Sequence, residues 1–399
     1  MSHSSAQRIF LDHIGQTTPF PFLLEIEKAE GIYLYEPSGK SYMDLISGVG
    51  VSALGHKHPK VIEAIKKQVD NHLHVMVYGE FVQSASNELA EILVKHLPET
   101  LNCVYFTNSG TESIEGALKL AKRYTGRTEM ISFRGAYHGS THGALSVSGN
   151  EKKKYAFRPL LPDIKFITHN DLNDLNEITE RTACVILETI QGDAGVRIPD
   201  KSYMQALRKK CTDTGTMLIF DEIQSGMGRT GKLFAFEHFD VVPDILCTAK
   251  ALGGGLPLGA FIAEREIMRH FTFNPMLGHI TTFGGNPVAC AAAVATLQVL
   301  TEDGLLETVE EKGALFENLI QHPSIKEVRR KGLLFAFEFE TEEEVMKIVE
   351  ECLKQGVICF WFLSCPNSFR IAPPLTISHE EIKIACKVIN ESILKAHTQ

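Results

Sequence analysis

The sequence predicts an α/β protein with a mostly parallel, doubly wound sheet and a smaller α+β domain. From about residue 60 to 295, short apolar runs alternate with helical segments, which is typical of parallel sheets covered by helices on both faces. After about residue 300 this alternation ends and shorter strands follow. The 399 residues are enough for a large domain and a small one, each with its own core.

The N-terminal region predicts a hairpin over residues 31–44, because apolar residues alternate around the turn Pro37-Ser38-Gly39. In the alternating region the clearest helix covers 111–124, where apolar residues share one face and Gly126 provides the stop. Strands are expected at 102–107, 128–133, 164–168, 183–188, 216–221, 244–249 and 259–263.

A long helix near 287–300 is expected to connect the two domains. Beyond it we expect a helix at 304–321 and a last helix that begins at the capping box of Ser378 and Glu381. Short strands are expected at 333–339, 356–362 and 369–371. The predicted parts are an N-terminal segment (1–47) that contributes to the small domain, a large cofactor-binding domain (48–300) and a small C-terminal α+β domain (301–399).

Composition argues against several classes of protein. The net charge is −9, and the longest basic run, Lys152-Lys153-Lys154, is interpreted as a solvated loop, so no nucleic-acid partner is expected. The nine cysteines lack CxxC spacing and are expected to be reduced thiols. The N-terminus is polar, no apolar stretch is long enough to cross a bilayer, and no histidine pair has a complete set of metal ligands. We therefore expect a cytoplasmic protein without a metal or a membrane anchor.

Three expected strands end on residues suited to chemistry. One ends on Asp221, a second leads into Lys250, and a third leads into Ser109-Gly110-Thr111 at the start of a helix. The carboxyl ends of strands in an α/β sheet form the edge where ligands bind. An amine, a carboxylate and a small-residue phosphate site together indicate pyridoxal phosphate, with Lys250 as the Schiff-base lysine.

The proposed roles follow from the chemistry of each group. Lys250 would move a proton between the substrate and the cofactor, and Asp221 would face the protonated pyridine nitrogen. Each residue also has an ordinary interpretation: Lys250 as a solvated loop lysine, Asp221 as a helix N-cap, and Ser109-Gly110-Thr111 as a helix cap without a ligand. Glu222 is a rival carboxylate for the role of Asp221.

Other candidates lie near these strand ends. Tyr137 can stack on a flat ring or pack in the core. Gln224 can donate to the phenolic oxygen of the cofactor or face solvent. Arg370 is the only arginine in an apolar segment and can bind a carboxylate or form a structural ion pair, with Asp193 as a possible partner when no substrate is bound.

Taken in order, these motifs resemble the class III, or ω-amino-acid, aminotransferases of PLP fold type I, over nearly the whole chain. The block from Asp221 to Gly231, followed by a lysine at 250, is the most specific. The matching motifs are Gly55-His56-x-His58-Pro59, Ser109-Gly110-Thr111-Glu112, Ala136-Tyr137-His138-Gly139, Glu188-Thr189-Ile190-Gln191-Gly192-Asp193, Phe220 to Gly231, Lys250, Thr282-Phe283-Gly284-Gly285-Asn286-Pro287 and Arg370-Ile371-Ala372-Pro373-Pro374.

The resemblance implies a homodimer whose active sites lie at the subunit interface, where Thr282 reaches the cofactor phosphate of the partner. It implies that Arg370 holds the α-carboxylate of glutamate or 2-oxoglutarate. Asp193, where the family usually has glutamate, would pair with Arg370 while an ω-amine donor is bound. The motifs that contain His138 and Glu188 place both residues near the cofactor.

The implied activity is amino transfer to 2-oxoglutarate by a ping-pong mechanism, with an N-acetylornithine-like donor as first choice. Ser140 stands where acetylornithine, ornithine and 4-aminobutyrate aminotransferases usually carry a donor-binding arginine, and Arg134 or Lys152 is a possible substitute. Val49 stands where ornithine aminotransferases have tyrosine. The alternatives are an ornithine, lysine, 4-aminobutyrate or diamine aminotransferase, an aminomutase or racemase of the same fold, and a binding protein without catalysis.

Overall fold

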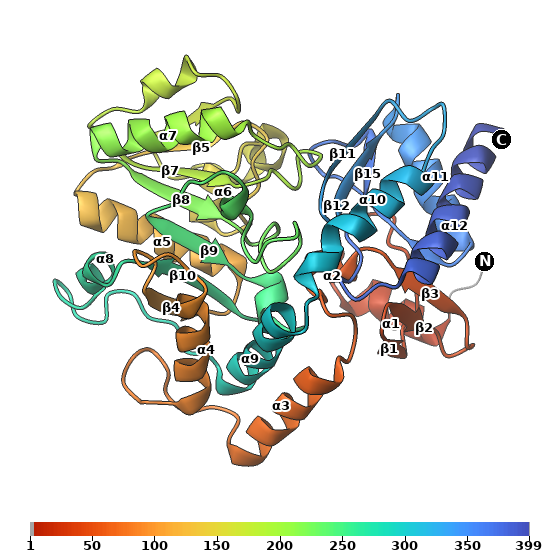
Figure 1. Cartoon of the computed structure of the whole chain (residues 1–399), viewed down its shortest axis with the longest axis horizontal. Coiled ribbons are helices and arrows are strands. Elements are labelled where there is room, and N and C mark those ends of the chain that lie inside the picture. The colour runs from red at the N-terminus through yellow and green to blue at the C-terminus, as the bar shows by residue number, and fades with distance from the viewer. Residues whose placement is uncertain (1–3, 399) are drawn as a thin grey trace.

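The structure is a computed structural model that describes residues 4–398. Its largest feature is a seven-stranded sheet (Figure 1) in which β10 runs in the direction opposite to the other six strands. The predicted mostly parallel sheet is therefore confirmed. In spatial order its strands are β4 (Cys103–Thr107), β10 (Gly259–Ala263), β9 (Ile245–Thr248), β8 (Met217–Asp221), β7 (Thr182–Glu188), β5 (Glu129–Phe133) and β6 (Ile164–Ile167).

Both faces of this sheet are buried, as β8 shows. Met217 and Ile219 belong to a core cluster shared with α5 (Gly110–Thr125). Leu218 and Phe220, which alternate with them, belong to the cluster shared with α7 (Lys201–Thr214). Because side chains of a strand point to opposite faces in turn, a run that is apolar throughout requires a layer of helices on each side.

A second layer of helices packs beside the sheet. The long helix α9 (Pro287–Glu302) contacts α3 (Pro59–Asn71) and α4 (Ser84–Lys95), and most of its residues are buried. Within residues 4–398 no single helix is long and apolar enough to cross a membrane, and α9 meets the criterion only jointly with 306–319, across a bend of 59°. Shorter helices are α1 (Ser5–His13), α2 (Ser47–Gly50), α6 (His142–Val147) and α8 (Arg265–Met268).

The chain beyond α9 forms a lobe with two small sheets, seen in blue and red on the right of Figure 1. The pairing of β13 with β3 joins the N-terminal strands to this lobe, which supports the proposal that residues 1–47 belong to the small domain. One sheet contains β11 (Glu327–Lys331), β12 (Leu334–Glu338), β15 (Ser368–Ile371) and β14 (Phe360–Trp361), and the other contains β1 (Lys28–Glu30), β2 (Tyr33–Tyr35), β3 (Ser41–Asp44) and β13 (Val357–Ile358). The helices are α10 (Val309–Leu319), α11 (Glu342–Lys354) and α12 (His379–Thr398).

The structure corrects the prediction for this lobe in four places. The single strand expected at 356–362 is two short strands, because the chain leaves one sheet after β13 and enters the other at β14. The helix expected from 304 begins at Val309, after Gly304 in a left-handed conformation and a short 3-10 turn. Two elements, α11 and the polar strand β11, were not predicted.

A tight contact between α5 and β10 yields a stability prediction. A Cβ on Gly116 would lie 2.3 Å from the Phe261 ring, so Gly116→Ala should destabilise the fold by about 1–3 kcal/mol through overpacking. Thermal unfolding should show a lower Tm, which the double variant with Phe261→Leu should partly restore. Gly15→Ala, at a position with no neighbour within 4 Å, is the control. An unchanged Tm in Gly116→Ala would contradict the packing.

Candidate active site

Two neighbouring strands bring two carboxylates to one edge of the large sheet. Glu188 ends β7 and Asp221 ends β8, and the two residues are direct partners in the register. Glu222 follows on the opposite side, where it accepts hydrogen bonds from Thr189 Oγ1 (2.9 Å) and from the backbone N–H groups that begin the 3-10 turn at Ala235. The rival carboxylate is thus a structural cap, and Asp221 faces the cavity.

A histidine from another segment fixes the Asp221 side chain. His138, in the loop after β5, has its Nδ1 2.7 Å from Asp221 Oδ2, and both side chains are buried. The other oxygen, Oδ1, accepts the backbone N–H of Ile223 at 3.0 Å. A buried carboxylate held on both oxygens has one orientation, which suits a group that must face a cation in the cavity.

A cavity of about 270 Å³ opens in front of these residues. Its volume matches a small cofactor with a substrate better than a macromolecule. It contains most of the predicted cofactor residues. The residues that line it are Gly110, Thr111, Tyr137, His138, Gly139, Ser140, Glu188, Ile190, Asp221, Ile223, Gln224, Ser225 and Lys250.

Lys250 reaches this cavity from the turn that follows β9. Its backbone is in the left-handed region (φ +47°), which is unusual for a residue with a Cβ and which strains the start of the 3-10 turn Lys250–Gly253. Burial, and after it the Arg370 cation, lowers the pKa of Lys250 to about 8, although nearby carboxylates oppose the change. Among residues 4–398 the amine has no hydrogen-bond partner. It is therefore available to react.

Glu188 ties two loops to the end of β7. Its Oε1 accepts the backbone N–H of Tyr137 at 2.9 Å, and its Oε2 accepts that of Gly192 at 2.8 Å. Burial raises the pKa of Glu188 to about 7, and the two backbone donors act in the opposite direction. The loop position of Tyr137 is thereby fixed, and its ring lines the cavity with 38% of the residue exposed.

The N-terminus of α5 forms the third part of the cavity. Ser109 is the N-cap and accepts the backbone N–H of Glu112 at 3.3 Å, as in an ordinary cap. Gly110 and Thr111 line the cavity, and a Cβ on Gly110 would lie 2.8 Å from Ile223. A helix N-terminus that opens on a cavity is a site for a phosphate group. With Lys250 and Asp221 in the same cavity, these residues fit pyridoxal phosphate.

Arg370 lies on β15, outside the residues that line the cavity, and its charge acts on Lys250. Only 6% of the residue is exposed, and its Nε is buried without a partner. The guanidinium lies 5.8 Å from the ring centre of Phe360 and 5.4 Å from that of Phe362. Burial lowers the pKa of Arg370, yet the group stays charged at neutral pH. An unpaired buried guanidinium near Lys250 is suited to a substrate carboxylate.

Asp193 does not form the possible ion pair with Arg370 in this structure, and the pairing implied while an ω-amine donor is bound stays a prediction. Its oxygens instead accept from Ser364 Oγ at 2.8 Å, from the backbone N–H of Leu363 at 3.1 Å and from Lys153 Nζ at 3.3 Å. Over residues 4–398 no ion pair joins Asp193 to Arg370. The interpretation of the lysine run as a solvated loop holds for Lys152 but not for Lys154, which is buried and donates to the carbonyls of residues 146 and 148.

Some predicted residues lie outside the cavity of their own chain. Thr282 is exposed on the loop before α9 and does not line the cavity. Lys152 is exposed, and Arg134 lines a different cleft, so neither residue supplies a charge beside Ser140. Val49 is exposed and has a left-handed backbone.

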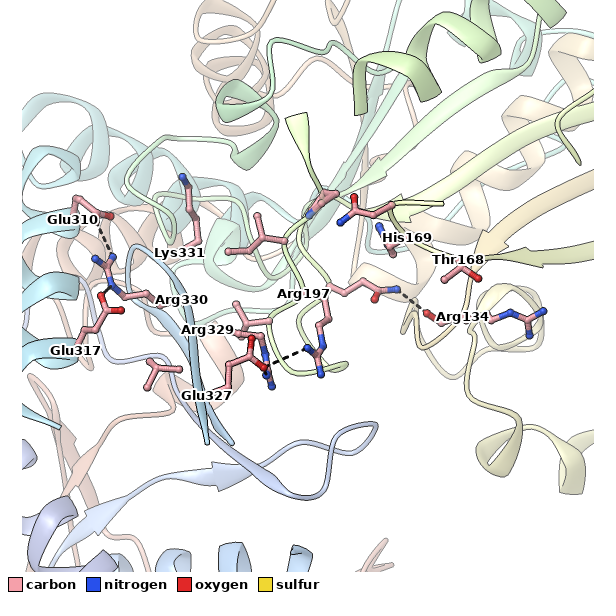
Figure 2. A pocket seen from close by; sticks show the side chains of 16 residues that line it. Arg134, Thr168, His169, Arg197, Glu310, Glu317, Glu327, Arg329, Arg330 and Lys331 are labelled. Carbon is pink, nitrogen blue, oxygen red and sulfur yellow. Dashed lines mark hydrogen bonds and ion pairs between the residues drawn. The ribbon is translucent and has the colours of Figure 1, made fainter. Parts of the chain in front are cut away.

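That other cleft is larger, about 790 Å³, but most of its charged side chains form ion pairs with one another (Figure 2). Arg330 pairs with Glu317 at 2.6 Å and with Glu310 at 2.8 Å, and Arg197 lies 3.8 Å from Glu327. Its lining includes Arg134 and Thr168, which follow β5 and β6 at the same edge of the sheet, but it includes neither Lys250 nor Asp221. The smaller cavity is therefore the candidate active site.

Comparison with known proteins decides the family, since residues 15–393 match the family model described as Aminotransferase class-III. The chain is a class III aminotransferase. Acetylornithine aminotransferase of Methanopyrus kandleri is 39% identical over 97% of this chain and 98% of its own, and that of Clostridium acetobutylicum is 40% identical over 93% and 97%. The crystal structure of adenosylmethionine-8-amino-7-oxononanoate aminotransferase from Methanocaldococcus jannaschii is 30% identical, with a TM-score of 0.90 and 98% coverage of both chains.

These relatives confirm the predicted family and fold type. They also confirm that the protein is a transaminase that depends on pyridoxal phosphate. The roles of individual residues stay predictions that rest on the geometry. Sequence reasoning missed Lys153 and Ser364, which contact Asp193. Their signal, a lysine within a basic run and a serine in a loop, is too common to single out.

The pKa of Lys250 leads to a pH prediction. An amine reacts with an aldehyde only when it is neutral, and its pKa of about 8 lies well below the ordinary 10.5. When cofactor is removed and pyridoxal phosphate is added back, the rate of regain of visible absorbance should rise through pH 8 and level off above it. A rate that still increases steeply toward pH 10 would show an amine of ordinary pKa.

Proposed function

We propose that this class III aminotransferase moves an amino group from an ω-amino donor, with N-acetylornithine as first choice, to 2-oxoglutarate by a ping-pong mechanism. The observation that carries this proposal is the unpaired guanidinium of Arg370, buried near the Lys250 amine, because it can bind the carboxylate of a 2-oxo acid. The relatives named acetylornithine aminotransferase support the choice of donor.

The cofactor, when bound, supplies an electron sink for the substrate α-carbon. Gly110 and Thr111 would hold its phosphate, with Ser109 capping the same helix. Asp221, oriented by His138, would keep the ring nitrogen protonated. The remaining assignments are that the Tyr137 ring stacks on the flat ring, Gln224 donates to its phenolic oxygen, and Glu188 positions the Tyr137 loop.

Lys250 would then act as the proton carrier. With a pKa of about 8, its amine is partly neutral near neutral pH and can accept a proton from one carbon and return it to another. Its turn is held by the end of β9 on one side and by the glycines that follow on the other.

A second copy of the chain is part of the proposal. Thr282 lies on an exposed loop and is absent from its own cavity, so it would contact a cofactor phosphate only in a partner subunit. The homodimer inferred from the family resemblance would bring it to that position.

A donor panel tests the choice of substrate. N-acetylornithine, ornithine, lysine, 4-aminobutyrate, putrescine and β-alanine should each be incubated with 2-oxoglutarate, and glutamate release measured. The proposal expects the highest kcat/KM with N-acetylornithine. Release of glutamate from another donor at a higher kcat/KM would replace that choice, and product formation without 2-oxo acid consumption would indicate a mutase or racemase.

Arg370→Ala should separate the two half-reactions. Loss of a charge-assisted bidentate contact costs about 2–5 kcal/mol, so KM for 2-oxoglutarate should rise about thirtyfold or more. KM for putrescine, which lacks a carboxylate, should change little. Steady-state kinetics with both substrates provides the measurement, and Arg197→Ala, outside the cavity, is the control. Equal effects of Arg370→Ala on both substrates would refute the role of Arg370.

A further inference from the structure

A loop on the large domain controls the surroundings of Asp193. Asn150 caps the 3-10 turn Glu151–Lys153 by accepting the backbone N–H of Lys152 at 3.1 Å. Its side-chain amide also donates to Ser364 Oγ at 3.0 Å, and that hydroxyl donates to Asp193 Oδ2 at 2.8 Å. The same turn directs Lys153 Nζ to Asp193 at 3.3 Å. One short turn thus supplies both a hydrogen-bond chain and a cation to this carboxylate.

The neighbouring Arg370 lacks such compensation. It is nine-tenths buried, its Nε has no partner, and its guanidinium faces the aromatic rings of Phe360 and Phe362. An unpaired buried cation is costly, and a carboxylate at hydrogen-bond distance would relieve that cost. Asp193 is buried and close enough to favour the charged form of Arg370, yet its oxygens are directed to other donors.

We propose that Lys153 is a specificity-determining residue that holds Asp193 away from Arg370. Because Lys153 binds Asp193, the Arg370 guanidinium stays free for the carboxylate of a dicarboxylic 2-oxo acid. Asp193 then does not have to move before that acid binds. This inference rests on the proposed function of Arg370 and adds the residue that keeps this arginine accessible.

The position of Lys153 is suited to this role. Its side chain is 30% exposed, so its ammonium keeps part of its hydration while it neutralises a buried carboxylate. The ammonium also lies 5.6 Å from the centre of the Tyr137 ring, at the wall of the cavity. Without it, Asp193 would keep only the hydroxyl of Ser364 and one backbone N–H, and Arg370 would be the cation that attracts it.

The test uses the pyridoxal phosphate-loaded enzyme and glutarate, a dicarboxylate as long as 2-oxoglutarate that lacks the keto group and cannot be transaminated. Isothermal titration calorimetry gives its Kd. Lys153→Met should weaken glutarate binding about tenfold, because Asp193 then occupies Arg370. The double variant with Asp193→Asn should restore the wild-type Kd. Lys152→Met, which removes an exposed charge from the same turn, is the matched control, and Lys153→Arg should bind as the wild type does.

Each alternative has its own outcome. An unchanged Kd in Lys153→Met would overturn the proposal. Weak binding in both the single and the double variant would also overturn it, by showing that Lys153 contacts the ligand directly. If the wild-type enzyme does not bind glutarate, the carboxylate role of Arg370 fails, and the role of Lys153 fails with it. Because glutarate does not react, these results do not depend on which donor the enzyme uses.

Discussion

The burial of one amine is the constraint on which the site depends. Lys250 enters a cavity at the carboxyl end of the large sheet, where an ammonium would be costly without compensation. The protein lowers its pKa to about 8 and places carboxylates of β7 and β8 nearby. The parallel register of these strands is what brings Glu188 and Asp221 to the same edge, so the sheet itself defines the electrostatics of the cavity.

The alternation of side chains explains why adjacent carboxylates differ in role. Asp221 continues the face of Ile219 and meets His138 at the cavity, while Glu222 turns to the other face and caps a 3-10 turn. Burial raises the pKa of Glu222 to about 8, against the effect of its three donors. A raised pKa alone would thus have indicated the wrong residue, and the geometry identifies the right one.

Sequence reasoning predicted the parts of this enzyme that follow from local pattern. All seven strands of the large sheet, and Lys250 and Asp221 at their ends, could be predicted because apolar runs and their terminal residues are contiguous in the chain. The partners of Asp193 could not, since Ser364 is 171 residues away and its approach depends on how the two lobes pack. The division of 356–362 between two sheets is likewise a tertiary effect.

The central claim is that Lys250 carries the cofactor covalently. It is tested most directly by reducing the purified enzyme with borohydride and mapping the modified peptide by mass spectrometry. The account predicts a pyridoxyl phosphate group on Lys250 and on no other lysine. A label on another lysine, or no label after the enzyme has been incubated with pyridoxal phosphate, would contradict it.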